Sequence, residues 1–492
     1  MKDLLARTPD IASMEPYWDK VSALLKGYDA VKNSGELFLA RFPNEQDDDY
    51  DLRLTKTKLT NVFRDVIEGL ASKPFQNEVA IVKGDDADNT EIPQYILDFV
   101  EDVDGAGNNL TMFSALTFFN GIGYGIDWIL VDYPTVVNAE GISVSEAKKK
   151  NIKPYWVHIL GKNVLEIHTR MEGSKEKLTY FRYKEPSYPG QPERVRIYSL
   201  NEDGKVHWGL FEEPEKKDDD WIMIAEGIMT IDEIPLVPFV VGRRNGSTWE
   251  LFPPMRDTVD LQMVLYENES ALEYIKMLAC YPMLATNGMK PSKNADGKTS
   301  KVSVGPNRVL YGLQTQDGRG GDWKYVEPNA NSLEFLQKNI EKTKQDLREL
   351  GRQPLTALST QLTTVTTSIA AGKAKSAVTA WVYALKDTLE NALRLTVKWM
   401  GKPEYEPQVN IYTGFDNVND DGSDLEELGK ARERGDLSRE TYWAELKRRK
   451  ILSAEFNAEA ETKRLLDEIP SYDAPDIDDN LNQEDNLNGM EN

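Results

Sequence analysis

The feature that most constrains the fold is the order of predicted elements between residues 253 and 400. A long helix with apolar residues on several sides comes first, and short strands with polar turns follow it. A second, more charged helix comes next, then a threonine-rich segment and a third long helix. This order describes a hairpin of two helices that carries a small module at its turn. It predicts a building part of an assembly, because no pattern of catalytic residues accompanies it.

The first helix of this hairpin has two apolar stripes. Pro253 and Pro254 open it at positions that tolerate proline, and it extends to about Cys280. The stripes contain Val259, Met263, Tyr266, Tyr274 and Met277, and Leu261, Leu265, Leu272, Ile275 and Leu278. A helix that is apolar on several sides is covered on several sides. The cover is either a large core in the same chain or neighbouring copies in a ring, and we predict the first stripe to lie in a subunit interface.

Composition narrows the class of protein. A chain of 492 residues exceeds what one hydrophobic core normally holds, so we expect about two to four domains. The net charge of −23 disfavours tight binding of nucleic acid, which needs clustered Lys and Arg. It is compatible with a surface along which DNA slides, but by itself it is better explained as acidity that keeps the chain soluble. The single cysteine, Cys280, cannot form an internal disulfide, which favours a reducing compartment. We expect no signal peptide and no membrane span.

The first 241 residues combine helices with short strands. Helical spacing dominates up to residue 119, and from Gly121 the pattern changes to short β-branched and aromatic runs. Strands are predicted at 126–131, 155–160, 177–183, 195–200, 206–210 and 221–225. The turn at 201–204 predicts a hairpin, and the prolines of 235–241 predict an edge strand. This region is expected to be a mainly antiparallel β domain.

The remaining elements complete a multidomain α+β fold. Strands are predicted at 283–286, 302–304, 309–313 and 323–326, and helices at 331–350 and around Val378–Leu393. Segment 355–367 reads as weakly structured and rich in hydroxyl groups, and a strand is expected at 406–413. Small helices follow at about 425–434, 439–450 and 454–467. Residues 471–492 are acidic and nearly free of aromatic residues, which predicts disorder.

Motifs of catalysis and cofactor binding fail on inspection. Gly121, Gly123 and Gly125 lack the third glycine and the following helix of a dinucleotide site, and residues 297–299 lack the first glycine of a phosphate loop. Segment 417–428 resembles a calcium loop, but its last ligand position is Leu428. The three histidines have no cysteine partners for zinc. We therefore predict no enzyme and no catalytic, cofactor-binding or metal-binding residues.

Two groups of residues are candidates for contact with DNA. Lys338, Lys342 and Arg348 lie on the second hairpin helix, either as part of an ordinary exposed face or facing a channel where they touch phosphates. The hydroxyl-rich segment is either a disordered connector or a loop that projects into a lumen. Its candidate residues are Thr363, Thr364, Thr366 and Thr367.

Three stretches carry a resemblance to a known family. They read LARFPNEQDDDYDLRL at 39–54, KYVEPNANSLEFLQKNIEKTKQDLRELGRQPLT at 324–356 and GDLSRETYWAELKRRKIL at 435–452. With the order of elements between 253 and 400, the chain resembles the portal proteins of tailed bacteriophages. The resemblance implies a homo-oligomeric ring of about twelve subunits at one capsid vertex, through which double-stranded DNA is packaged and ejected. It places the protein in the virion, after assembly in the host cytoplasm.

The same resemblance implies a division of the chain and a set of partners. It gives a wing (1–253), a first stem helix (254–280), a clip (281–330), a second stem helix (331–350), a channel loop with long helix and return strand (351–422), a crown (423–470) and an acidic tail (471–492). The clip is expected to dock the terminase and then head–tail adaptors, and the wing to meet the major capsid protein. The candidate docking residues are Lys290, Lys293, Lys298 and Arg319.

Two other classes of function stay open from the sequence. One is a different virion connector or tail component, and its position in a particle would identify it. The other is a metal-dependent hydrolase that uses scattered carboxylates, which predicts a magnesium-dependent activity lost on substitution of a single Asp or Glu. A ring of copies is the property that separates the portal from the hydrolase.

Overall fold

The computed structural model describes residues 3–82, 92–134, 153–215, 219–280, 283–287, 322–326, 330–351, 364–413, 423–448, 451–452 and 456–468. Helices and antiparallel sheets are both present, so the predicted α+β class is confirmed. The chain divides into two compact units, Met1–Phe415 and Asp416–Asn492, each of which is considered by itself.

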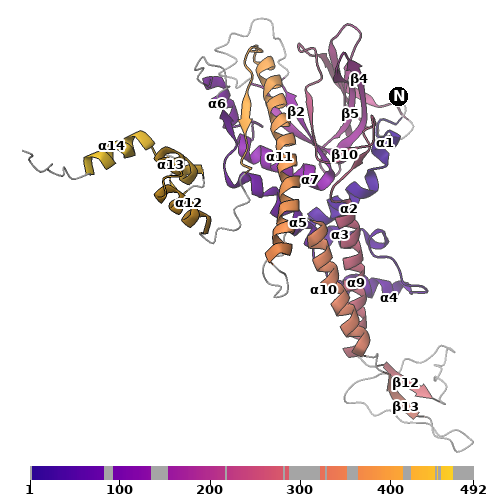
Figure 1. Ribbon diagram of the computed structural model, residues 1–492. Helices are drawn as coiled ribbons and strands as arrows, with labels where there is room; N and C mark the ends of the chain where they lie inside the picture. The colour runs from indigo at the N-terminus through magenta and orange to yellow at the C-terminus, as the bar shows by residue number, and fades with distance from the viewer. Residues whose placement is uncertain are drawn as a thin grey trace, which may run out of the picture. The chain divides into compact units, whose positions relative to one another are not determined.

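Short helices form the N-terminal part of the first unit (Figure 1). They are α1 (Pro9–Ala12), α2 (Glu15–Lys26), α3 (Tyr28–Asn33), α4 (Asp47–Lys56), α5 (Val62–Ala71), α6 (Gln94–Val100) and α7 (Leu110–Tyr124), with 3-10 turns at Gly35–Leu37 and Lys73–Gln76. Asn61 and Asn109 cap α5 and α7, because each side chain accepts a hydrogen bond from a backbone N–H of the first turn.

Helix α7 continues past the point where the sequence predicted a change to strand. Gly121 and Gly123 lie inside it, and it ends at Gly125, which takes a left-handed conformation with φ of 84°. A Cβ atom at Gly121 would clash with the ring of Phe239, so this glycine lets the helix approach the sheet closely. The glycine spacing therefore serves helix–sheet packing.

Two antiparallel sheets follow. The first has the order β3-β2-β9, built from β2 (Ile126–Asp132), β3 (Tyr155–Leu160) and β9 (Leu236–Val240), so the predicted edge position of the proline-containing strand is confirmed. The second is a five-stranded meander of β4 (Val164–Glu172), β5 (Lys175–Glu185), β6 (Arg194–Leu200), β7 (Val206–Glu212) and β8 (Ile222–Ile228). The hairpin predicted at 201–204 joins β6 to β7. Small pairs link β1 (Ala80–Val82) with β14 (Gln408–Asn410), and β10 (Arg243–Arg244) with β11 (Leu251–Phe252).

The helical hairpin with its small module is present. Helix α9 (Arg256–Cys280) packs against α10 (Ala330–Leu350), and between them the chain forms the antiparallel pair β12 (Met283–Asn287) and β13 (Asp322–Val326). Figure 1 shows this pair at the far end of the two helices. The outer two of the four predicted module strands are thus confirmed, and those at 302–304 and 309–313 lie outside the described residues.

Helix α11 (Thr364–Trp399) closes the core of the first unit. It packs along β2 and β9, and its last turns are fixed by two indole groups. Trp156 donates a hydrogen bond of 2.8 Å to the hydroxyl of Thr396, and Trp399 donates one of 3.1 Å to the carbonyl of Val131. The helix begins at Thr364, so part of the segment predicted to be a loop is helical.

The second unit contains α12 (Ser423–Glu433), α13 (Arg439–Arg448) and α14 (Ala458–Glu468), close to the three predicted helices. Trp443 and Phe456 meet edge to face, with ring centres 5.5 Å apart. Among the described residues of this unit no side chain is fully buried, whereas the first unit has a large continuous core. The predicted disordered tail lies outside the described residues.

Candidate assembly surface of the helical hairpin

The apolar stripes of α9 are covered mainly by the chain's own helices. Val259 and Tyr266 have no exposed surface, and Met263 retains 8%. These three residues have at most 8% of their surface left for a second subunit, so the packing within one subunit does not support their predicted interface role. The reason is that α2, α4, α5 and α10 all pack on α9, which is the own-core alternative for a many-sided apolar helix. Tyr274 and Met277, nearer the module, remain half-buried.

A buried arginine joins α9 to α4. The guanidinium of Arg53 makes two hydrogen bonds of 2.7 Å to the carboxylate of Glu45, and their side chains are 1% and 4% exposed. It also donates to the carbonyl of Ala40 at 2.7 Å and to the hydroxyl of Ser270 on α9 at 3.3 Å. The hydrogen bonds from Arg53 hold the pKa of Glu45 below its usual range. The arginine therefore fixes three segments of the chain at one point.

The same side of α9 carries further buried polar contacts. Glu269 accepts hydrogen bonds from the backbone N–H and the hydroxyl of Thr60, and lies 3.6 Å from the ammonium of Lys344 on α10. Gln262 accepts from the N–H of Phe63 and donates to the carbonyl of Thr60, both at 3.0 Å. Since buried polar groups fit only one arrangement of partners, these contacts fix the position of α9 along its axis.

The three basic candidates on α10 differ in their surroundings. Lys338 pairs with Glu334 on the same helix at 2.7 Å, and both side chains are mostly exposed. Arg348 lies 3.0 Å from Asp65 of α5, so it holds α10 to the body of the unit. Lys342 has no hydrogen-bond or ion-pair partner among the described residues. The three candidates, which the sequence did not distinguish, therefore differ in role. Lys338 is weakly paired, Lys342 is free among the described residues, and Arg348 holds the structure together.

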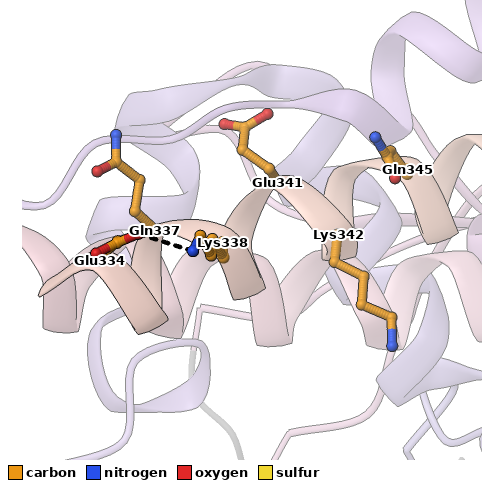
Figure 2. Close-up of a pocket in the computed structure, with 6 residues that line it drawn as sticks. All are labelled: Glu334, Gln337, Lys338, Glu341, Lys342 and Gln345. Carbon is orange, nitrogen blue, oxygen red and sulfur yellow. Dashed lines mark ion pairs between the residues drawn. The ribbon is translucent and has the colours of Figure 1, made fainter. Parts of the chain in front are cut away.

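A shallow groove of about 380 Å³ runs along the exposed side of α10. Its lining consists of Glu334, Gln337, Lys338, Glu341, Lys342 and Gln345. Figure 2 shows the side chain of Lys342 extending away from those of Gln337, Glu341 and Gln345. Helix α10 carries as many acidic as basic residues, so this surface offers individual charges within a mixed field.

The C-terminal end of α10 is fixed in place. Leu347 is fully buried, and the last residue before the undescribed segment, Gly351, packs against Val66 of α5. A Cβ atom at Gly351 would overlap the methyl groups of Val66 and lie 3.0 Å from the carbonyl of Leu347. The segment predicted to be a channel loop thus starts from a fixed anchor.

For several candidate residues the structure gives no side-chain environment. Thr363 lies outside the described residues, as do the four candidate docking residues Lys290, Lys293, Lys298 and Arg319. Thr364, Thr366 and Thr367 belong to the first turns of α11, so their backbone is helical and the predicted loop is wrong for them.

Arg53 is the residue that sequence reasoning missed. It lies in the quoted stretch 39–54, among four aspartates and beside the phenylalanine, proline and asparagine of a turn. Its guanidinium also stacks 4.0 Å from the ring centre of Phe42. An arginine following aromatic residues in a turn was a usable signal, but its burial depends on α9, which lies more than two hundred positions away.

A second buried polar cluster lies in the core. Asp127 is fully buried, 3.0 Å from Nδ1 of His158, and receives a hydrogen bond of 3.3 Å from Asn120. Burial raises the pKa of the Asp127 carboxyl. His158 stacks on Phe113. No nucleophile is hydrogen-bonded to His158 among the described residues, and the pair reads as part of the packing between α7 and β2.

The described residues form neither a metal site nor a membrane span. They contain no group of three or more His, Cys, Asp or Glu side chains placed to hold a metal ion. None of the helices in the described ranges combines the length and apolar character needed to cross a membrane.

Comparison with known proteins gives one family match and several structural neighbours. Residues 254–400 match the family described as "Domain of unknown function (DUF4055)", which covers the hairpin, its module and α11. No curated protein matches the sequence.

Structures that resemble the chain include three from gene transfer agent (GTA) particles. A chain from the neck of the native GTA particle, computed with C12 symmetry, is 11% identical with a TM-score of 0.42, covering 85% of this chain and 99% of the neighbour. A chain from the neck of the empty particle, computed with C6 symmetry, is 12% identical with a TM-score of 0.40, covering 91% and 98%. A chain of the native GTA virion is 11% identical with a TM-score of 0.39, covering 89% and 98%.

Proposed function

We propose that this chain is the subunit of a phage portal, a non-enzymatic ring at the capsid vertex through which double-stranded DNA enters and leaves. The observation that carries the proposal is the hairpin of α9 and α10 with the β12–β13 pair at its far end. Its base is fixed to the subunit body by Arg53, Glu269 and Arg348. A hairpin held so firmly at its base suits a stem, because a stem must keep its shape while another molecule moves past it.

The charge of the chain supports a conduit for DNA. The chain's 59 Lys and Arg residues are outnumbered by 82 Asp and Glu residues, so DNA that passes along it releases few counterions and is held only weakly. Isolated hydroxyl or basic groups then supply weak contacts that do not depend on base sequence. Thr363, Thr364, Thr366 and Thr367 stay candidates for such contacts, whereas Arg348 is engaged by Asp65.

The remaining assignments follow from the same proposal. Residues 1–253 form the wing, 281–330 the clip between the two stem helices, and 423–470 the crown. The clip docks the terminase during packaging and the head–tail adaptors afterwards, with Lys290, Lys293, Lys298 and Arg319 as candidate contacts. The wing meets the major capsid protein. The complete ring contains about twelve subunits, which a repeated heterologous interface can close.

The purified full-length protein tests this function. Native mass spectrometry and negative-stain images viewed down the symmetry axis are expected to show a closed ring with a central hole. A monomer at all concentrations, from micromolar upward, would contradict the proposal. Particles made without the chain are expected to lack packaged DNA, and restoring the wild-type chain is expected to restore packaging. Restoration by a variant that cannot form rings would also contradict it.

A further inference from the structure

One face of α10 combines a large apolar side chain with two lysines. Phe335, Lys338 and Lys342 recur at i, i+3 and i+7, which places them on the same side of the helix. Phe335 is 75% exposed, more than any other large apolar side chain that the structure describes on the two hairpin helices. Lys338 is paired only with Glu334 of its own helix, and Lys342 has no partner among the described residues. The three residues of this α10 face are exposed in the part of the chain that the structure describes.

A complementary face lies on α4. Asp48, Asp51 and Leu52 are exposed at i, i+3 and i+4 and therefore also share one side of a helix. Neither aspartate has an ion-pair partner in the part of the chain that the structure describes, and Leu52 is 40% exposed. The opposite side of α4 is buried through Tyr50 and Arg53, so this α4 face is held rigidly outward.

The two faces lie on opposite flanks of the stem. Figure 1 shows α4 on one side of α9 and α10 on the other, and both helices pack on α9. In copies placed side by side, the α10 face of one copy is therefore directed toward the α4 face of the next.

The two faces also lie at the same height along α9. Phe42, just before α4, contacts Tyr274, and Arg53 contacts Ser270. Lys344 lies beside Glu269, so Lys342 and Lys338, which precede it on the antiparallel helix, lie beside the α9 residues that follow Glu269. Rotation about an axis parallel to the stem preserves this height, so the lysines of one copy come level with the aspartates of the next.

We propose that the α10 face of one copy docks on the α4 face of a second copy. Lys338 and Lys342 pair with Asp48 and Asp51, and Phe335 packs on Leu52. This interface rests on the proposed ring and specifies one contact that closes it. It is heterologous, since two different faces meet, and such contacts generate rings when the rotation closes.

The observations favour a second copy over DNA as the occupant of the α10 face. Phe335 gains nothing beside a phosphate backbone, whereas burial against an apolar side chain stabilises it. Glu334 pairs with Lys338 at 2.7 Å, and this carboxylate opposes the approach of a polyanion. A second copy supplies both carboxylates and an exposed apolar residue.

Charge reversal in the full-length protein tests the interface. The variant K338E/K342E, or D48K/D51K, is expected to raise the concentration needed for half-assembly roughly tenfold or more, because two complementary pairs become repulsive. Combining all four substitutions is expected to restore ring formation. The matched control, K205E/K402E, makes the same charge change at exposed positions elsewhere and is expected to assemble as wild type.

The outcomes separate this inference from the proposed function. Rings of K338E/K342E that assemble normally but bind DNA more weakly would overturn the interface and assign the lysines to the channel. Rings that are unchanged in both respects would also overturn it. In each case the portal proposal would stand. A wild-type protein that never forms rings would overturn both.

Cross-linking gives an independent readout of the contact. In a C280S background, K338C combined with D51C is expected to form intermolecular disulfides and a ladder of covalent oligomers on mild oxidation. The matched pair K205C with D51C is expected to remain monomeric under denaturing, non-reducing conditions. The absence of a ladder from assembled rings of the K338C/D51C variant would contradict the proposed docking.

Discussion

The two helices of the hairpin are built on different principles. Helix α9 carries both apolar and polar residues that are buried by the subunit itself, including Gln262, Glu269 and Ser270. Helix α10 buries Ile340, Thr343 and Leu347 on one side and exposes most of the rest. One helix is therefore part of the subunit core, and the other presents a surface. Apolar content alone therefore does not identify an interface, since the more apolar helix has less exposed surface.

The largest expected effect is on the buried polar anchor of α9. Arg53→Met leaves the Glu45 carboxylate buried without its partner, which is expected to lower the free energy of unfolding by about 3–5 kcal/mol. Urea denaturation, monitored by tryptophan fluorescence, measures this change in the free energy of unfolding. Arg41→Met, which removes an exposed arginine from the same turn, is the control and is expected to leave the midpoint near that of wild type. Equal midpoints for the two variants would show that the Arg53 anchor has no special role.

A smaller effect is expected where α10 ends. Gly351→Ala places a methyl group against Val66 and is expected to cost about 1–3 kcal/mol, as overpacking in a close contact does. Adding Val66→Ala is expected to recover part of this loss, and a double-mutant cycle gives the coupling. Strictly additive effects would mean that α10 and α5 are not in contact at this point.

Lowering the pH tests the buried Arg53–Glu45 pair that anchors α9. The folded-state pKa of Glu45 lies below its unfolded value because of Arg53, so the pair stabilises the protein above the unfolded pKa. This contribution is lost as pH falls from the ordinary glutamate range, near about 4.3, toward the lower folded-state value. Arg53→Met is expected to flatten that part of the stability–pH curve. An unchanged slope would contradict the role of this pair.

The smallest effect is expected on the exposed side of α10. Lys338→Ala removes only a solvent-exposed pair with Glu334 and is expected to change the unfolding free energy of the isolated subunit by less than about 0.5 kcal/mol. Thermal unfolding of a ring-free preparation measures it. A loss comparable to that of Arg53→Met would mean that α10 also belongs to the subunit core.

Sequence patterns predicted the elements well wherever one periodicity dominates. The strands at 126–131 and 155–160 and the helix at 331–350 agree with β2, β3 and α10 almost residue for residue. Strand β4 was not predicted, because its outer half, His168–Glu172, is largely exposed and polar. The end of α7 was misplaced because glycines that pack a helix against a sheet look like turn residues.

The candidate site was less predictable because its determinants are distant in sequence. The identity of the residues that cover α9 depends on how α4 and α5 fold back, which no local period reveals. Likewise, Lys338, Lys342 and Arg348 look equivalent in sequence, and only the position of Asp65 separates the arginine from the lysines. Sequence patterns predicted the hairpin and its module. Which faces of the two helices are exposed depends on tertiary packing, which those patterns do not reveal.

The buried position of Arg53 has a consequence for exchange of gene segments. Residues 254–400 match one family as a block, and a crossover just before α9 would join two related genes at the edge of this block. Such a chimera would pair the Glu45–Arg53 turn of one parent with the Ser270 position of the other. Viable recombinants are therefore expected to inherit residues 39–57 and α9 from the same parent. These two segments are distant in sequence but are expected to be inherited together.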